Sequence, residues 1–247
     1  MQVLKPKQLP QHGTFICIYG QSGVGKTVTS LATLPKPLFW IVTEPRDLRK
    51  PLEAAGTTED DVDIGPYENL EDLLTFLSDG ENFKRNKAVF FDSLSYTMSI
   101  ELAKEIGLEA YESRDKKSKI DRPIASQMKT TMEGHGIRNT SVFRILNLLG
   151  SLAASGKVVV VSCLEMEHPK FDRELSAAPA LSGKEVPNAF PGFFDLIGRL
   201  TPRMDKDTGK IVYPPIVSFE SNGDYMAKFT GKGGRRVGPL DWMKILK

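Results

Sequence analysis

Short apolar runs alternate with amphipathic stretches along the chain, and this alternation is the first guide to its fold. Four runs are almost entirely apolar and predict buried β-strands at residues 14–20, 37–44, 87–94 and 157–165. Unbroken apolar strands are typical of parallel sheets whose two faces are both covered. The pattern therefore predicts an α/β fold with a mostly parallel central sheet flanked by helices.

Stretches with helical periodicity lie between these strands. The clearest is 69–80, where Leu70, Leu73, Leu74 and Leu77 share one helical face and Gly80 ends the element. Further helices are predicted at 26–34, 47–56, 95–111 and 137–156, and a minor strand at 61–67. Strands and helices thus alternate through the first two thirds of the chain.

The C-terminal third has a different pattern. Residues 194–203 and 210–220 flank the turn-like sequence MDKDTG, which predicts a β-hairpin, and 225–238 adds another strand. We expect these antiparallel strands at the C-terminal edge of the sheet. The segments 112–134 and 166–190 show no clear period, so we expect loops or partly ordered structure there.

Length and composition favour one domain. The chain has 247 residues, of which 40% are hydrophobic and 26% charged, which is ordinary for a globular protein. We expect a single domain over 1–247, with an extended leader at 1–12 and a basic, glycine-rich tail at 231–247. The formal net charge of +2 means that contact with nucleic acid would need local basic patches.

The two cysteines, Cys17 and Cys163, lie inside apolar runs, which predicts buried thiols in a reducing compartment. The N-terminal sequence has no apolar signal core, and the longest apolar runs are far shorter than a membrane span. We therefore expect a cytoplasmic protein that does not contact membranes.

The loop after the first predicted strand is rich in glycine and ends in lysine and threonine. It matches the phosphate-loop pattern G-x-x-x-x-G-K-[ST] with Gly20, Gln21, Ser22, Gly23, Val24, Gly25, Lys26 and Thr27. Glycines let backbone N–H groups surround phosphate oxygens, and the N-terminus of the following helix adds more donors. In this pattern Lys26 binds the β- and γ-phosphates, and the Thr27 hydroxyl binds Mg²⁺.

Asp92 is the candidate second ligand of Mg²⁺. It ends the apolar strand KAVFFD, which is the usual position of the Walker B carboxylate. Because aspartate often follows a strand, an ordinary turn residue is the alternative.

Glu44 is the candidate group that orients water for attack on the γ-phosphate. It lies at the end of the second predicted strand, where RecA-like ATPases carry their catalytic glutamate, although a solvent-exposed strand-end carboxylate is the alternative. Asp92 is followed by Ser93, so the adjacent Asp-Glu pair of AAA+ ATPases is absent. No [NT]-K-x-D motif follows a later strand, which argues against a GTPase.

The order of these motifs resembles that of the RecA-like P-loop ATPases of bacteriophages, a group of AAA-type nucleotide-binding proteins that includes single-strand annealing recombinases. The resemblance covers roughly residues 14–242 and rests on GQSGVGKT, FWIVTE, VFFDSL, VVVVSCLE and the C-terminal TGKGGRRVGPLD. The two Walker motifs are specific for nucleotide binding, whereas the short C-terminal signature narrows the choice among families of nucleotide-binding proteins.

The resemblance implies a RecA-like fold and a DNA-dependent ATPase that uses ATP and Mg²⁺. It also implies action on single-stranded DNA in recombination or annealing, as a homo-oligomeric ring or filament, beside a single-strand DNA-binding protein. If the chain is encoded by a phage, its location is the cytoplasm of the host cell. One departure concerns the fourth strand, which usually ends in a Gln, Asn or His γ-phosphate sensor; here the candidate is Ser162.

Two segments have the composition of loops that contact DNA. The first holds Lys116, Lys117, Lys119 and Arg122, and the second holds Lys170 and Arg173 with Phe171 and Phe190 as candidate stacking groups. Charged loops are more often only solvated, and acidic residues dilute both segments. The tail offers Lys228 and Arg235 as candidates for a basic finger that completes a neighbouring subunit's site. A solvated basic segment or a second DNA surface is the alternative.

Two further functions stay open at this point. A nucleotide-gated module could bind DNA with little ATP turnover, which the weak sensor favours. A small-molecule kinase would need an arginine-rich lid over the nucleotide, but 112–134 is rich in lysine and holds only Arg114 and Arg122.

Overall fold

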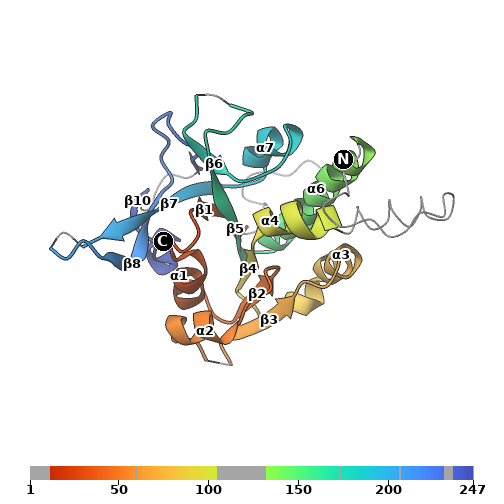
Figure 1. Cartoon of the computed structure of the whole chain (residues 1–247). Helices are drawn as coiled ribbons and strands as arrows, with labels where there is room; N and C mark the ends of the chain where they lie inside the picture. The colour runs from red at the N-terminus through yellow and green to blue at the C-terminus, as the bar shows by residue number, and fades with distance from the viewer. Residues whose placement is uncertain are drawn as a thin grey trace, which may run out of the picture.

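A twisted sheet runs through the molecule, and helices cover both of its faces (Figure 1). This computed structural model describes residues 12–58, 60–104, 132–172, 174–205, 207–230 and 236–246. Within these ranges the strand order is β10-β8-β7-β1-β5-β4-β2-β3, with β6 paired to β5 and β9 paired to β7. No helix among the described residues is long and apolar enough to cross a membrane.

The parallel part of the sheet consists of the predicted apolar strands and two neighbours. Its strands are β1 (Thr14–Gly20), β2 (Leu38–Val42), β3 (Val62–Pro66), β4 (Ala88–Asp92), β5 (Val158–Glu167) and β7 (Leu196–Met204). The strands β8 (Ile211–Ser218) and β10 (Val237–Pro239) extend it in antiparallel fashion beyond β7. This arrangement confirms the α/β fold with antiparallel strands at one edge.

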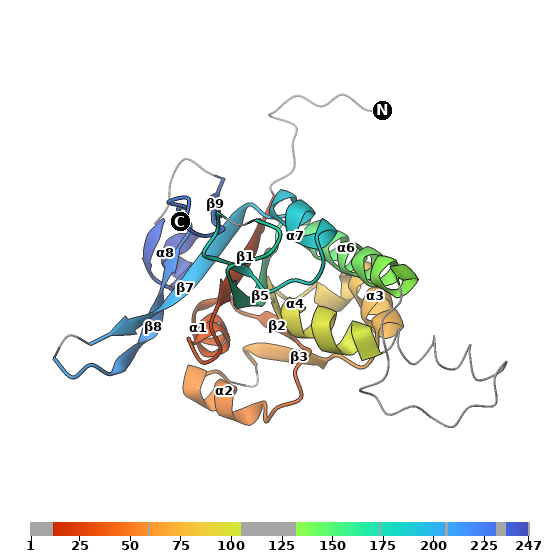
Figure 2. The same ribbon diagram turned by 45° about the horizontal axis from the view of Figure 1, so that its top comes forward.

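Two layers of helices pack against the sheet. The first contains α1 (Lys26–Thr33), α2 (Arg49–Ala55) and α8 (Trp242–Ile245), and α1 contacts both of the others. The second contains α3 (Leu70–Ser78), α4 (Leu94–Tyr96), α6 (Met132–Ala154) and α7 (Glu185–Ala189). A π-helical turn at Thr97–Glu101 follows α4, and 3₁₀ turns lie at Gly80–Phe83 and Phe190–Gly192. Figure 2 shows the two layers on opposite sides of the strands.

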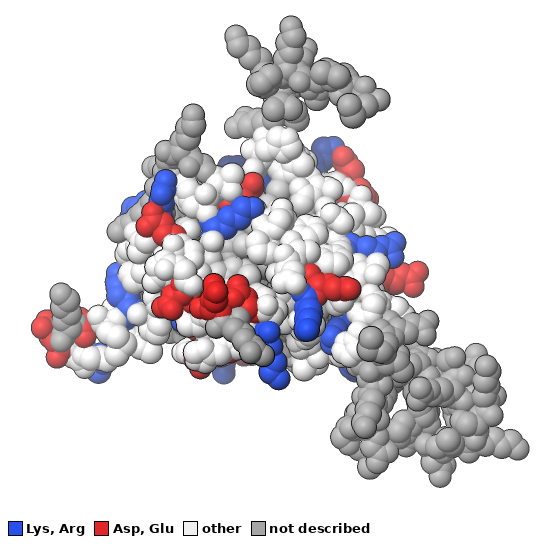
Figure 3. Space-filling model, turned by 90° about the horizontal axis from the view of Figure 1, so that it is seen from above, with Lys and Arg blue, Asp and Glu red and all other residues white. Residues whose placement is uncertain are grey.

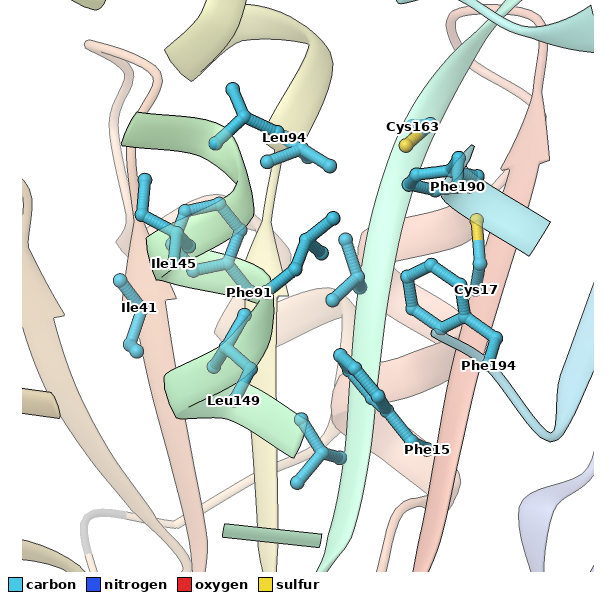
Figure 4. Packing of buried hydrophobic residues seen from close by; sticks show 14 of the residues in the cluster. Phe15, Cys17, Ile41, Phe91, Leu94, Ile145, Leu149, Cys163, Phe190 and Phe194 are labelled. Carbon is cyan, nitrogen blue, oxygen red and sulfur yellow. The ribbon is translucent and has the colours of Figure 1, made fainter. Parts of the chain in front are cut away.

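The larger hydrophobic core lies between the sheet and α6. Ile145 and Leu149 project from α6 toward Ile41 and Phe91 on the strands, and all four are buried (Figure 4). Cys17 and Cys163 are free, buried thiols on β1 and β5, and burial raises the pKa of the Cys17 thiol well above its usual value. Both cysteines therefore act as small core side chains, as the sequence predicts.

Phe190 corrects one sequence prediction. It is completely buried, and its ring centroid lies 4.6 Å from that of Phe194 (Figure 4). A ring enclosed in the core cannot stack on a DNA base, so Phe190 is not available for the contact that its loop-like surroundings suggested.

Residues 166–190 are also more ordered than their composition predicts. β6 (Ala177–Pro179) pairs with the end of β5, and α7 follows at Glu185–Ala189. Each element is too short to show a period in the sequence. Helix α6 spans Met132–Ala154 and so extends beyond the predicted start at 137, whereas residues 105–131, which include the end of the predicted helix 95–111, lie outside the described residues.

Two features of the topology place functional groups. β5 lies between β1 and β4, so the end of β5 separates the phosphate-loop strand from the strand that ends at Asp92. The β7–β8 hairpin extends past the body of the molecule (Figures 1 and 2). It carries the exposed apolar residues Met204, Ile211 and Tyr213.

Candidate nucleotide site

The predicted phosphate loop connects β1 to α1. Gly23 and Gly25 have φ angles of +78° and +100°, which glycine adopts without steric cost. The loop therefore turns sharply, and α1 begins at Lys26 with the unpaired N–H groups of its first turn at the end of the loop. Helix N-termini of this kind favour anionic ligands.

Lys26 is held inside this loop and is only 8% exposed. Its ammonium donates hydrogen bonds to the carbonyl oxygens of Gly20 and Gln21, at 2.7 and 2.9 Å. Burial lowers the pKa of Lys26, and the charge of Asp92 opposes that shift. A poorly hydrated ammonium gains more from an incoming phosphate than a fully solvated one would, because less water must be displaced.

Asp92 has more hydrogen-bond and ion-pair partners than Glu44, and it is 2% exposed. Its Oδ2 accepts a hydrogen bond from the Thr27 hydroxyl at 2.8 Å, and its Oδ1 accepts one from the Ser162 hydroxyl. The structure thus brings Thr27 and Asp92 together as the sequence predicts. Ser162 lies beside them because β5 separates β1 from β4, and it orients Asp92 through this bond.

Glu44 lies next to the end of β4. The Thr43 hydroxyl bridges the backbone N–H and C=O of Ser93, at 2.9 and 3.0 Å, and so ties the loop after β2 to Ser93. The Ser93 hydroxyl then donates to Glu44 Oε1 at 2.9 Å. This contact fixes a carboxylate near Asp92 and gives Ser93 a role that the sequence did not reveal.

Arg46 is a member of the site that sequence reasoning missed. Its guanidinium forms an ion pair with Asp92, lies 3.7 Å from Glu44 Oε2, and donates to Thr27 Oγ1 at 3.3 Å. The signal in the sequence was its position two residues after Glu44, because the two side chains extend from the same short loop.

A cavity of about 800 Å³ opens over these groups. Tyr213, from the distant β8 strand, lines one side of it and donates from its hydroxyl to the carbonyl of Gly23 at 3.1 Å. The loop after β2 and helix α2 line the other side. Small-molecule sites commonly measure about 300–1,000 Å³, so the space suits a nucleotide.

Comparison with known proteins places the chain in a family. The sequence matches the family model described as an AAA domain over residues 12–232. The chain belongs to this AAA domain family. The crystal structure of the flagellar accessory protein FlaH from Methanocaldococcus jannaschii is similar over 92% of this chain and 84% of that chain, with a TM-score of 0.44 and 12% sequence identity. No curated protein matches the sequence.

The AAA domain of this chain offers oxygen ligands of the kind that Mg²⁺ prefers. The Thr27 hydroxyl and the Asp92 carboxylate are hard oxygen ligands, as Mg²⁺ prefers. Among the described residues no group of three or more His, Cys, Asp or Glu side chains forms a metal site. Phosphate oxygens and water would therefore complete the coordination of Mg²⁺, which is its usual mode of binding.

A second cavity of about 800 Å³ lies between β3 and α3. Its lining includes Phe39, Ile41, Leu73 and Phe76 but no part of the glycine loop. Lys26, Thr27 and Asp92 line the first cavity and not the second.

The other predicted residues lie away from this cluster or outside the described residues. Lys170 is exposed in the turn between β5 and β6, and Lys228 donates to the carbonyl of Pro191 at 2.9 Å. That bond anchors Lys228 within its own subunit, and its role as a finger stays a prediction. Residues outside the described ranges are Lys116, Lys117, Lys119, Arg122, Arg173 and Arg235.

Gly25 offers a test of the loop geometry. A Cβ at Gly25 would lie 2.7 Å from the ring of Tyr213, whereas one at Gly23 would have no atom within 4 Å. Both substitutions carry the left-handed backbone cost of about 1–2 kcal/mol. We expect Gly25→Ala to lower the free energy of unfolding further than Gly23→Ala, by about 1 kcal/mol, in urea titrations. Equal losses in the two variants would show that the Tyr213 ring does not confine the loop.

Proposed function

We propose that this AAA domain binds ATP with Mg²⁺ and hydrolyses it. The observation that carries the proposal is the convergence of Lys26, Thr27, Asp92 and Glu44 around one nucleotide-sized cavity. Membership of the AAA domain family supports a P-loop ATPase in general. The absence of a guanine-recognition motif from the sequence favours adenine.

Each residue has a distinct part in this reaction. The loop N–H groups and Lys26 bind the β- and γ-phosphates and neutralise the charge that develops during transfer. Thr27 and Asp92 would hold Mg²⁺, which would neutralise negative charge on the phosphates. Glu44 accepts a hydrogen bond from the attacking water and orients it in line with the leaving oxygen. Ser93 and Ser162 position Glu44 and Asp92.

We further propose that single-stranded DNA is the polymer on which this ATPase acts, in recombination or annealing. The resemblance to phage recombinases supports this proposal, and so does the exposed Lys170 in the turn after β5. That turn adjoins the phosphate loop, because Gln21 Nε2 donates to Glu167 Oε1 at 3.3 Å. A nucleotide bound to the loop could therefore alter the position of the turn.

The charge distribution limits where DNA can bind. Figure 3 shows acidic side chains gathered near the middle of one face, with basic side chains scattered around them. Phosphate contacts require exposed basic groups, so we assign DNA binding to local loops such as the one that holds Lys170. A homo-oligomeric ring or filament, a single-strand DNA-binding protein as partner, and a cytoplasmic location all belong to this proposal.

A nucleotide-gated DNA-binding module with little turnover is the second candidate. The hydrogen bond from Ser162 to Asp92 favours it, because a hydroxyl committed to Asp92 is less available to sense the γ-phosphate. The two candidates differ in the rate of ATP hydrolysis.

Steady-state ATPase assays with and without single-stranded DNA separate these functions. Hydrolysis stimulated by single-stranded DNA and lost in Lys26→Ala supports the leading proposal. ATP-dependent retention of DNA in filter binding without hydrolysis supports the gated module. Binding to single- and double-stranded DNA should be compared with ATP, ADP or no nucleotide across several salt concentrations, because phosphate contacts weaken as salt rises.

A further inference from the structure

Arg46 is the one basic side chain of the described site that contacts both carboxylates. It follows β2 by four residues, and 30% of its side chain is exposed. The guanidinium pairs with Asp92 and lies 3.7 Å from Glu44. Its carbon also lies 5.6 Å from the centre of the Trp40 ring, a cation–π contact that holds the side chain over the sheet.

The contacts of Arg46 coincide with those required of the metal. The guanidinium reaches Asp92 Oδ2 and Thr27 Oγ1, which are the same two oxygen atoms that would hold Mg²⁺. A Mg²⁺ ion on these oxygens would repel the guanidinium at contact distance. Binding of Mg²⁺ therefore favours a guanidinium position away from Asp92.

The nearest new anion would be the γ-phosphate of the same nucleotide. Thr27 and Asp92 would hold Mg²⁺ beside the phosphates, so a guanidinium that leaves these two residues would remain within the phosphate site. The planar guanidinium can donate two parallel hydrogen bonds to a phosphate. Lys26, by contrast, is deeper and is bonded to the loop carbonyls.

We propose that Arg46 binds the γ-phosphate of the nucleotide in its own subunit, exchanging Asp92 for phosphate oxygens when Mg²⁺ binds. This inference rests on the proposed function, since it requires a triphosphate at the site. It gives the site an internal arginine, whereas Lys228 and Arg235 were expected to reach a neighbouring subunit.

The discriminating measurement compares a triphosphate with a diphosphate. Dissociation constants for a non-hydrolysable ATP analogue and for ADP, both with Mg²⁺, are measured for wild type, Arg46→Ala, Arg46→Lys and Arg49→Ala. We expect Arg46→Ala to weaken the ATP analogue by about 10- to 100-fold and ADP by less than about threefold. Arg46→Lys should recover part of the loss, because it restores charge without the planar fork.

Arg49→Ala is the matched control. The Arg49 side chain is 85% exposed and pairs only with Asp47 in the described contacts, so its removal should leave both affinities unchanged. If Arg46→Ala weakens binding of the ATP analogue and of ADP equally, Arg46 only supports Asp92. If neither affinity changes, Arg46 has no role in nucleotide binding. Either result overturns the inference. Failure of the wild type to bind either nucleotide would instead contradict the proposed function.

Mixing two impaired variants tests whether Arg46 acts within its own subunit. A Lys26→Ala subunit keeps Arg46 but lacks a working phosphate loop, whereas an Arg46→Ala subunit has the reverse defect. We expect mixtures to hydrolyse ATP no faster than the sum of the two variants assayed alone. Recovery of activity on mixing would show that Arg46 acts on a neighbouring subunit and would overturn this part of the inference.

Discussion

Glu44→Gln is expected to lower the rate of ATP hydrolysis by about 100- to 10,000-fold, the usual range for loss of a general base. Glutamine keeps the length of the side chain and can still accept a hydrogen bond from Ser93. It removes the negative charge that polarises water. Because Glu44 touches neither the loop nor Thr27 in the described contacts, the dissociation constant for Mg·ATP should change by less than about threefold. Single-turnover hydrolysis and equilibrium binding measure the two quantities separately.

Glu53→Gln is the control for this experiment, because Glu53 is an exposed glutamate of α2 that does not line the cavity. It should hydrolyse ATP at the wild-type rate. A Glu44→Gln protein that keeps more than about a tenth of wild-type turnover would exclude Glu44 as the residue that activates water.

Asp92→Asn should remove the dependence of nucleotide binding on magnesium. The carboxylate is buried and accepts hydrogen bonds from Thr27 and Ser162, so the amide would occupy the same space. The amide lacks the negative charge that holds Mg²⁺, and its NH₂ group cannot accept a bond from Thr27. We expect turnover to fall by at least about 100-fold, since a bound metal lowers the free energy of the charged transition state by about several kcal/mol.

Titration with Mg²⁺ at fixed ATP measures this effect directly, with Asp47→Asn as control. Asp47 also lines the cavity, but its described partner is the exposed Arg49. We expect a clear Mg²⁺ midpoint in wild type and Asp47→Asn, and none in Asp92→Asn. An unchanged midpoint in Asp92→Asn would mean that Asp92 is only a structural residue at the end of a strand.

Sequence patterns predicted those parts of the site that lie within one short stretch of the chain. The phosphate loop follows from the glycine spacing, and Asp92 follows from its position at the end of an apolar strand. Each of these signals lies within about ten residues of chain. The same holds for the β7–β8 hairpin, whose strands flank a short turn.

Residues that reach the site through the topology were not predictable in this way. Tyr213 meets Gly23 across 190 positions of sequence, and that contact depends on how the β7–β8 hairpin lies against the phosphate loop. Ser162 was a candidate from the sequence, but its contact with Asp92 was not predicted, because it arises from the position of β5 between β1 and β4 and no sequence pattern encodes that order. Arg46 was overlooked because a single charged residue in a loop is usually solvated.

Burial was the other quantity that sequence could not provide. Phe190 lies in a stretch of mixed composition that resembles a surface loop, yet it packs against Phe194 in the core. It shares the larger hydrophobic core with buried residues of β1, such as Phe15 and Cys17, which are far from it in the sequence. A lone aromatic residue has no period, so its environment depends on tertiary packing.

The most direct test of the account is equilibrium binding of labelled ATP, with Mg²⁺, to the wild type and to Lys26→Ala. If the backbone amides and the lysine at the start of α1 hold a triphosphate, the wild type will bind saturably and Lys26→Ala will bind at least about 100-fold more weakly. Thermal unfolding of the two nucleotide-free proteins establishes that both are folded. Equal affinities in two folded proteins, whether measurable or absent, would contradict the central claim.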